Sequence, residues 1–144
     1  MNKGLAYSLN ELLREILVRK YDYIARMDAD DISLKNRFFD FFNFMEKNKE
    51  CDVVGSNIIE FYDDGSEKII TYKTSPEEIK KKFAFKTAIP HVTAFFRKSF
   101  FTKASLYNSQ SIQNEDLYLW LSGFLNECIF SSIPKPLVRV RMSG

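Results

Sequence analysis

The stretch YDYIARMDADDIS, from Tyr21 to Ser33, is the part of this sequence that decides the fold. A short apolar segment, Tyr23 to Met27, runs directly into three carboxylates within four positions, Asp28, Asp30 and Asp31. Carboxylates this close repel one another, so clustering them costs stability unless something positive lies among them. The pattern predicts a strand that ends in an acidic turn, and it raises the question of which positive group that turn receives.

The whole chain has the composition of one globular domain. Its 144 residues are 45% hydrophobic and 28% charged, a mixture that argues against disorder. The 21 basic and 19 acidic residues leave a formal net charge of +2, too even a balance to indicate nucleic-acid binding. There is no repeat, low-complexity tract or flexible linker, so a single α/β domain over residues 1–144 is the simplest organisation.

Cysteine, histidine and apolar runs limit the compartment and the metal chemistry. Cys51 and Cys128 are too few and too far apart for a disulfide framework, and the single histidine, His91, excludes a Cys/His metal cluster. The first residues show no secretory-signal pattern, and no run approaches the roughly 20 apolar residues that span a bilayer. We therefore expect a cytoplasmic protein, with peripheral contact at the inner face of the membrane left open.

Periodicity predicts two helices around the acidic stretch. Apolar residues recur on one face from Leu5 to Leu17, which is typical of an amphipathic helix. Ser33 is a candidate N-cap for a second helix. Four apolar side chains would share one face of that helix: Phe38, Phe41, Phe42 and Met45.

The second half of the chain has the signals of further strands and helices. Residues 51–74 are typical of two strands joined by a turn at Asp63-Asp64-Gly65. Ser75 and Pro76 mark a helix start. Residues 91–97 and the segment from Pro136 onward have strand patterns. A last helix over residues 114–125 would carry four apolar side chains on one face: Leu117, Trp120, Leu121 and Phe124.

Phenylalanine is unusually frequent, with 14 residues. Most of seven are expected in the core: Phe38, Phe41, Phe42, Phe95, Phe96, Phe100 and Phe101. The alternative for those near Ser99 is that they face a lipid-linked acceptor or a membrane.

Taken alone, the acidic turn has two interpretations. In open α/β sheets ligands bind beyond the carboxyl ends of the strands. Mg²⁺ and Mn²⁺ prefer oxygen ligands, commonly one or two carboxylates together with substrate phosphates. Such a cation would offset the repulsion and hold a diphosphate leaving group. The alternative is that the Asp side chains cap the following helix or form an Asx turn.

Further motifs occur in a fixed order around this turn. Three segments in the first half are NKGLAYSLNELL, YIARMDADDIS and RFFDFFNFMEKNKECDVVGS, and three in the second half are PHVTAFFRKS, NEDLYLWL and PLVRVR. Together they resemble the inverting, nucleotide-sugar-dependent glycosyltransferases of family two. The resemblance covers nearly the whole chain. It implies part of a GT-A domain, a Rossmann-like α/β fold with a mixed sheet flanked by helices.

The resemblance implies a role for each matched acid. Asp28 and Asp30 fall on the family's Asp-x-Asp, which contacts the nucleotide ribose and the metal. Asp30 is the first choice as a ligand for Mn²⁺ or Mg²⁺, with Asp31 a further candidate. Asp116 falls on the catalytic base that removes a proton from the acceptor hydroxyl. Glu115 would position the acceptor or tune Asp116, although both acids would also suit a helix N-terminus by complementing its dipole.

Other matched residues have a structural alternative beside the functional one. Arg26 would approach a donor phosphate or pair with an acid. His91 matches the family's histidine, near the donor or the acceptor, or it bonds backbone at a strand start. Asn2, Gly4 and Asn10 match the family's helix motif, where Gly4 would let the backbone approach the donor or simply start the helix.

Compared with the family, the sequence is short. The family's domain normally opens with a strand, a nucleotide-contacting Asp and two β-α units before a helix like the one at Leu5, and related chains continue beyond PLVRVR. We therefore expect a partial domain over residues 1–144 that lacks the first nucleotide-binding β-α units. Strand edges and part of the first helix's apolar face should then be exposed.

The implied function is sugar transfer with inversion from a nucleotide-diphosphate donor, with a UDP-sugar favoured, to a saccharide or lipid-linked saccharide. The setting would be bacterial surface polysaccharide or glycolipid synthesis, without nucleic acid. One alternative is a non-catalytic remnant or accessory chain, completed by another polypeptide or a second copy. A third interpretation is a metal-dependent nucleotidyltransferase, which would not need Asp116.

Overall fold

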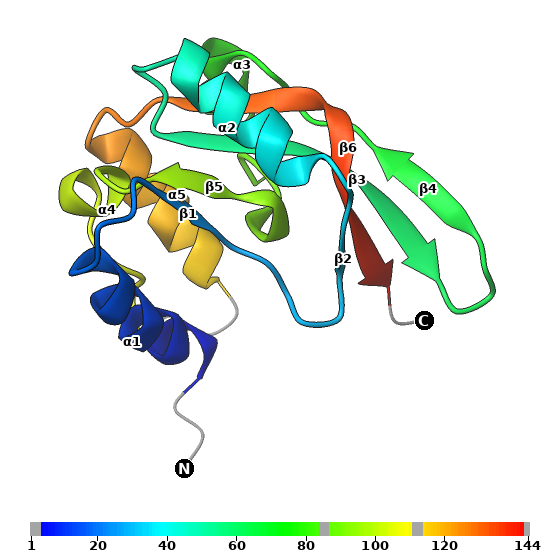
Figure 1. Ribbon diagram of the computed structural model, residues 1–144, viewed down its shortest axis with the longest axis horizontal. Helices are drawn as coiled ribbons and strands as arrows, with labels where there is room; N and C mark the ends of the chain where they lie inside the picture. The colour runs from blue at the N-terminus through cyan, green and yellow to red at the C-terminus, as the bar shows by residue number, and fades with distance from the viewer. Residues whose placement is uncertain (1–3, 84–86, 111–113, 143–144) are drawn as a thin grey trace.

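The computed structural model describes residues 4–83, 87–110 and 114–142. Within them a mixed sheet carries helices on its two faces (Figure 1). The strands are β1 (Tyr23–Ala25), β2 (Ile32–Ser33), β3 (Val53–Tyr62), β4 (Glu67–Ile70), β5 (Phe95–Arg97) and β6 (Phe130–Met142). The helices are α1 (Leu5–Leu17), α2 (Arg37–Lys47), α3 (Pro76–Phe83), α4 (Phe100–Lys103) and α5 (Glu115–Leu125), with a 3-10 turn, η1, at His91–Thr93.

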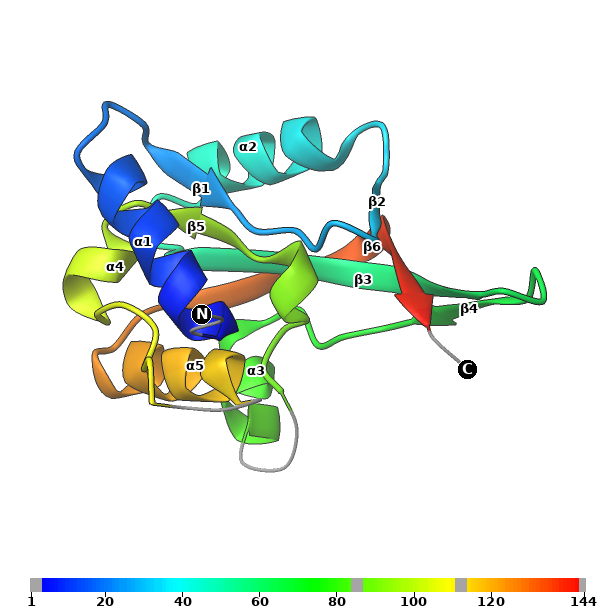
Figure 2. The ribbon, with the colours of Figure 1, turned by 90° about the horizontal axis from the view of Figure 1, so that it is seen from below.

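The sheet is organised around β3. The strand order is β1-β5-β3-β6-β2, with β4 also paired to β3. β3 and β6 run parallel, whereas β5 is antiparallel to both β1 and β3. The strands β1, β3 and β6 therefore point the same way, and α5 runs back toward the start of β6 (Figure 2). This arrangement puts the N-terminal end of α5 on the side where β1 ends.

Successive residues in the central strands serve opposite faces of the sheet. Val53 and Phe96 join the larger core cluster, which contains side chains from α1, α3, α4 and α5. Val54 and Phe95 join a smaller cluster under α2. Figure 2 shows the sheet edge-on, with α2 on one side and α3 and α5 on the other. The period of two along a strand is what lets one sheet hold both clusters.

Most predicted elements are confirmed, including the first helix, the hairpin around residues 63–65 and the capped start of α3, where the backbone N–H of Glu78 donates to Ser75 Oγ at 3.3 Å. Ser33 as an N-cap is wrong. Ser33 lies in β2, where it pairs with Val138 of β6, and α2 begins only at Arg37. The predicted strand from Tyr23 ends at Ala25, and residues 91–97 divide into η1 and β5. β6 begins six residues before Pro136.

The buried face of α2 differs from the predicted one. Arg37, Phe41 and Met45 are fully buried, at a spacing of four residues, while Phe38 and Phe42 are about half exposed. The face predicted from apolar residues alone is rotated from the face that α2 buries, because the buried Arg37 is the first residue of the buried face.

The last helix shows a similar shift. α5 buries Leu119, Trp120 and Gly123, whereas Leu117 and Leu121 are exposed. The small Gly123 lets the ring of Phe130 approach the helix closely, which fixes the face that α5 turns to the sheet.

Five of the seven phenylalanines expected in the core are buried: Phe41, Phe95, Phe96, Phe100 and Phe101. The burial of the last two contradicts the interpretation that they face a lipid or a membrane. None of the described helices is long and apolar enough to cross a bilayer. As expected, the chain presents an edge strand, β1, and part of the apolar face of α1 is exposed at Leu5 and Leu12.

Both cysteines are buried and unpaired, as expected. Burial raises the pKa of the Cys51 thiol to about 12 and that of the Cys128 thiol to about 11. Both thiols therefore stay protonated at neutral pH, which excludes them as nucleophiles.

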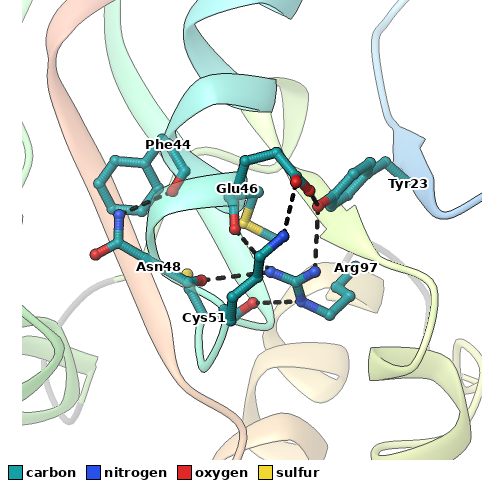
Figure 3. A network of polar contacts seen from close by, with 8 residues as sticks. Tyr23, Phe44, Glu46, Asn48, Cys51 and Arg97 are labelled. Atoms are coloured by element: carbon teal, nitrogen blue, oxygen red, sulfur yellow. Dashed lines mark hydrogen bonds and ion pairs between the residues drawn. The ribbon is translucent and has the colours of Figure 1, made fainter.

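Arg97 fastens the C-terminal end of α2 to the sheet (Figure 3). Its guanidinium donates to the carbonyl oxygens of Met45 at 3.0 Å, Asn48 at 3.3 Å and Cys51 at 3.1 Å. It also donates to the Tyr23 hydroxyl at 3.2 Å, which links the network to β1. One side chain thus satisfies carbonyls that the end of a helix leaves without intrahelical partners.

Gly123→Ala should destabilise the fold, because a Cβ there would lie 2.7 Å from Phe130 Cζ and 2.9 Å from Phe100 Cε2. Overpacking of this kind costs about 1–3 kcal/mol. Denaturant unfolding measures the loss. Leu125→Ala on the same helix is the control, since Leu125 is 74% exposed, and it should change stability by less than about 0.5 kcal/mol. Equal effects of the two changes would contradict this packing.

Candidate active site

The acidic turn follows β1 directly and carries its own counter-charge. Arg26 Nη1 donates to Asp28 Oδ2 at 2.7 Å, and the Arg26 side chain is only 9% exposed. The backbone N–H of Arg26 donates to Ala94 O at 3.0 Å, which ties the turn to the segment before β5. Part of the positive charge that the three acids require is therefore supplied by Arg26, two residues before Asp28.

Asp31 closes the turn against the last strand. Its Oδ1 accepts the backbone N–H of Arg141 at 3.0 Å, and its own N–H donates to Asp28 O at 3.4 Å. Its Oδ2 is buried and has no hydrogen-bond partner among the described residues. Desolvation, together with the charges of Asp28 and Asp30, raises the pKa of Asp31 against the opposing effects of the Arg141 amide and Arg26.

Asp30 lies at the tip of the turn with an exposed side chain. Its carboxylate makes no hydrogen bond or ion pair with the described residues, so it is the acid that is open to a ligand. Within the described ranges, no three His, Cys, Asp or Glu side chains gather to hold a metal ion. The donor set therefore fits a cation that takes one or two carboxylates here and its other ligands from a substrate phosphate.

A buried arginine lies behind the turn. Arg37 Nη2 donates to Arg26 O at 2.6 Å and to Val92 O at 3.0 Å, and the residue is fully buried. Burial lowers the pKa of Arg37 to about 10, while the charge of Asp31 raises it and that of Arg26 lowers it. The guanidinium therefore stays positive at neutral pH and adds to the field that offsets the acids.

His91 lies at the start of η1, where its ring is 8% exposed. Its Nε2 is 2.7 Å from the hydroxyl of Tyr107, and its ring meets Trp120 edge-on at 5.7 Å between centroids. Desolvation, with a smaller effect from Arg26, lowers the pKa of His91 to about 3. The ring is therefore neutral at physiological pH, which favours a role in orienting Tyr107 over acid–base chemistry.

Tyr107 is buried beside His91, and charges from two segments of the chain act on its pKa. Desolvation is the main reason that its pKa is raised; the charge of Arg26 opposes this, and those of Asp116 and Glu115 add to it. Arg26 and Tyr107 also line the same apolar cavity.

Asn10 holds the backbone of Tyr107 from α1. Its Nδ2 donates to Tyr107 O at 2.8 Å, and its Oδ1 accepts the Tyr107 N–H at 2.9 Å. Asn10 is 4% exposed, so this reciprocal pair satisfies both of its polar ends in the core. The two hydrogen bonds fix the position of the Tyr107 backbone relative to α1.

Glu115 and Asp116 occupy the first turn of α5 and are partly exposed. Asp116 Oδ1 accepts the backbone N–H of Leu117 at 2.7 Å. This bond is one that a helix N-terminus offers to an acid, which agrees with the structural alternative for Asp116.

Two further residues of the matched helix motif are Gly4 and Asn2. Gly4 is the residue before α1, with φ 88°, and open space surrounds the position that a Cβ would take. A side chain there would be strained by the backbone conformation, which accounts for glycine at a helix start. Asn2 lies outside the described residues.

An apolar cavity of about 150 Å³ lies beside this site, between α1 and β1. Aliphatic side chains such as Leu12 and Ile24 form most of its wall, with Arg26 and Tyr107 at its border. Its lining does not suit a charged nucleotide, so the acidic turn, and not this cavity, is the candidate donor site.

Residues 1–103 match the family model described as "Glycosyl transferase family 2". The chain belongs to this family. The expected recognition and the GT-A fold class are thereby confirmed. The match includes the acidic turn and His91, and the remaining residues carry α5 and β6.

Individual relatives agree with this membership. An uncharacterized glycosyltransferase of Haemophilus influenzae is 33% identical over 99% of this chain and 52% of its own length. The "UDP-Gal:alpha-D-GlcNAc-diphosphoundecaprenol beta-1,3-galactosyltransferase" of Escherichia coli is 31% identical over 99% of this chain and 50% of its own. The chain thus spans about half the length of the curated relatives it matches.

Solved glycosyltransferase structures show the same fold. S. aureus TarS 1-349 in complex with UDP-GlcNAc superposes with a TM-score of 0.73 and 14% identity, covering 99% of this chain and 40% of that one. At this level of identity the likeness concerns the fold alone.

Sequence reasoning on this family 2 chain missed two residues of the site. Tyr107 belongs to no quoted motif, and nothing in its neighbourhood in the sequence marks it. Arg37 was noted only as part of a motif. Its signal was nevertheless present, because it precedes Phe41 and Met45 at four-residue spacing, on the stripe that α2 buries.

His91 should stay neutral across the physiological range. As the only histidine, it gives a single imidazole signal in NMR, which should not titrate between pH 5 and 8. Its folded pKa lies below the ordinary 6.5, so its contribution to stability is complete above pH 6.5. That contribution is lost as the pH falls toward 3, at about 1.4 kcal/mol per pH unit.

The matched control is His91→Gln, which keeps a polar group beside Tyr107 without a titrating ring. Its unfolding free energy should fall less steeply than that of the wild type between pH 6.5 and 5. An imidazole signal that titrates near 6.5, or identical slopes for the two proteins, would contradict the burial of a neutral ring.

Proposed function

We propose that this chain holds the cation-binding acids and the acceptor base of an inverting glycosyltransferase that uses a nucleotide-diphosphate sugar. The observation that carries the proposal is the topology: β1, β3 and β6 point the same way, so the acidic turn after β1 and the first turn of α5 lie on the same side of the sheet. The charges of Arg26 and Asp116 also act on the pKa of Tyr107, in opposite directions. A donor site and a base must lie on one side of the sheet for a single displacement to occur.

In this proposal Asp30, with Asp28, binds Mn²⁺ or Mg²⁺ and the nucleotide end of the donor, and Asp31 is a further ligand candidate. When bound, the cation neutralises charge on the departing diphosphate. Asp116 accepts the proton of the acceptor hydroxyl as that oxygen attacks the anomeric carbon from the face opposite the diphosphate, which inverts the configuration. Glu115 positions the acceptor beside it, and Gly4 lets the backbone approach the donor.

The relatives support a proposal for the substrates. One relative is named for UDP-Gal and a diphosphoundecaprenol-linked acceptor, and one fold neighbour was solved with UDP-GlcNAc. Relatives also include the amylovoran biosynthesis and O-antigen biosynthesis glycosyltransferases AmsE and WbnJ. We therefore propose a UDP-sugar donor and a saccharide or lipid-linked acceptor in surface polysaccharide synthesis. A lipid-linked acceptor would bring the chain to the inner face of the membrane.

A second candidate is a non-catalytic chain or one completed by another polypeptide. The residues present span about half the length of the relatives that they match. Such a chain would keep the fold and the buried Tyr107 contacts but would not bind the donor by itself.

A thermal melt with UDP and Mn²⁺ separates the two candidates. A ligand that binds only the folded state stabilises it by about 2.7 kcal/mol at a hundredfold excess over its dissociation constant. We expect a Mn²⁺-dependent rise in the midpoint for the wild type, none for Asp30→Ala, and an unchanged rise for Asp116→Asn, which removes only the base.

Asp22→Ala is the matched control. It removes an exposed acid at the other end of β1, where Asp22 offers its backbone carbonyl to Lys98 N–H at 2.9 Å. This variant should keep the full shift. Loss of the shift in Asp116→Asn as large as in Asp30→Ala would refute the division of roles, and a wild-type melt without any shift would favour the non-catalytic chain.

A further inference from the structure

Arg37 joins the two segments on which the site depends. One nitrogen, Nη2, donates to the carbonyl oxygen of Arg26 at 2.6 Å and to that of Val92 at 3.0 Å. Arg26 lies two residues before Asp28, and Val92 directly follows His91. A single side chain on α2 therefore sets the spacing between the acidic turn and the His91 segment.

This arrangement lowers the stability of the fold. Arg37 is fully buried, and its Nε and Nη1 atoms have no hydrogen-bond partner among the described residues. A buried cation that is only partly hydrogen-bonded costs stability, and an apolar residue would suit a position above Phe41 and Met45 better. Costly groups of this kind persist where the geometry they impose is needed.

An acid of the turn also has a buried polar atom without a partner among the described residues. This acid is Asp31, whose charge is opposite to that of Arg37, and the atom is Oδ2. Three unpartnered polar atoms thus belong to two residues of opposite sign at the base of the turn. The cation and the acid hold the turn through charge, while Nη2 holds its backbone through hydrogen bonds.

We propose that Arg37 is a positioning residue that fixes the acidic turn against the His91 segment, and thereby sets where the donor phosphates and their cation lie. The inference rests on the proposed function for its consequence in donor binding. The fixing of the turn itself stands on the contacts of Arg37 alone.

Arg97 provides a matched control. It also donates to backbone carbonyls from a mostly buried position, but it fastens the opposite end of α2, at Met45 and Asn48. Its contacts do not include the residues of the acidic turn. Arg37→Met and Arg97→Met each leave buried carbonyls unpartnered, so both should lower the melting midpoint.

Hydrogen exchange of the full chain, followed by mass spectrometry, tests the positioning directly. Arg37→Met should speed exchange at least tenfold in peptides covering residues 26–34, where the Arg26 and Asp31 amides are bonded to Ala94 O and Asp28 O. Arg97→Met should speed exchange in residues 45–53 and leave 26–34 at the wild-type rate. Arg37→Lys, which keeps the charge, should be intermediate and guards against a methionine variant that fails to fold.

Binding of UDP with Mn²⁺ is measured on the same proteins. We expect at least a tenfold weaker affinity for Arg37→Met, partial recovery in Arg37→Lys, and less than a twofold change for Arg97→Met. Unchanged exchange in 26–34 for both Arg37 variants, or equal loosening by Arg97→Met, overturns the positioning role. If exchange follows the expected pattern but the wild type binds no UDP with Mn²⁺, the proposed function fails while the positioning of the turn stands.

Discussion

Repulsion among Asp28, Asp30 and Asp31 is the constraint on which the rest of this structure depends. The chain meets it with charge and hydrogen bonds drawn from three directions: the Arg26 ion pair within the turn, the Arg37 guanidinium from α2, and the Arg141 amide from β6. These groups offset part of the repulsion and leave Asp30 exposed. The negative charge of the three acids is therefore not fully offset on the side that faces solvent. A cation with substrate phosphates would offset the remainder there.

The parallel pairing of β3 with β6 decides where the acids of α5 lie relative to that turn. Because α5 returns to the start of β6, its N-terminal acids reach the side of the sheet where β1 ends. Tyr107 is held by Asn10 through its backbone and by His91 through its hydroxyl. In open α/β folds ligands bind beyond the carboxyl ends of the strands, and the acidic turn follows the carboxyl end of β1.

Much of this could be predicted from the sequence, and the exceptions have physical causes. The α/β class and the acidic turn follow from periodicity and local spacing, and the family follows from the order of motifs. The face of α2 could not be derived from apolar residues, because Arg37 takes a core position that tertiary hydrogen bonds make tolerable. Tyr107 could not be found either, since its partners come from α1 and η1 and leave no local signal.

The long β3–β6 pairing also has a consequence for the order of events in folding. It joins residues more than seventy positions apart, from Val53 with Phe130 to Tyr62 with Met142. Such distant contacts form slowly, since the chain must first close a large loop. Asp31 receives its only side-chain hydrogen bond among the described residues from this last strand. During synthesis the acidic turn would therefore emerge before β6 and acquire its shape only after β6 has joined the sheet.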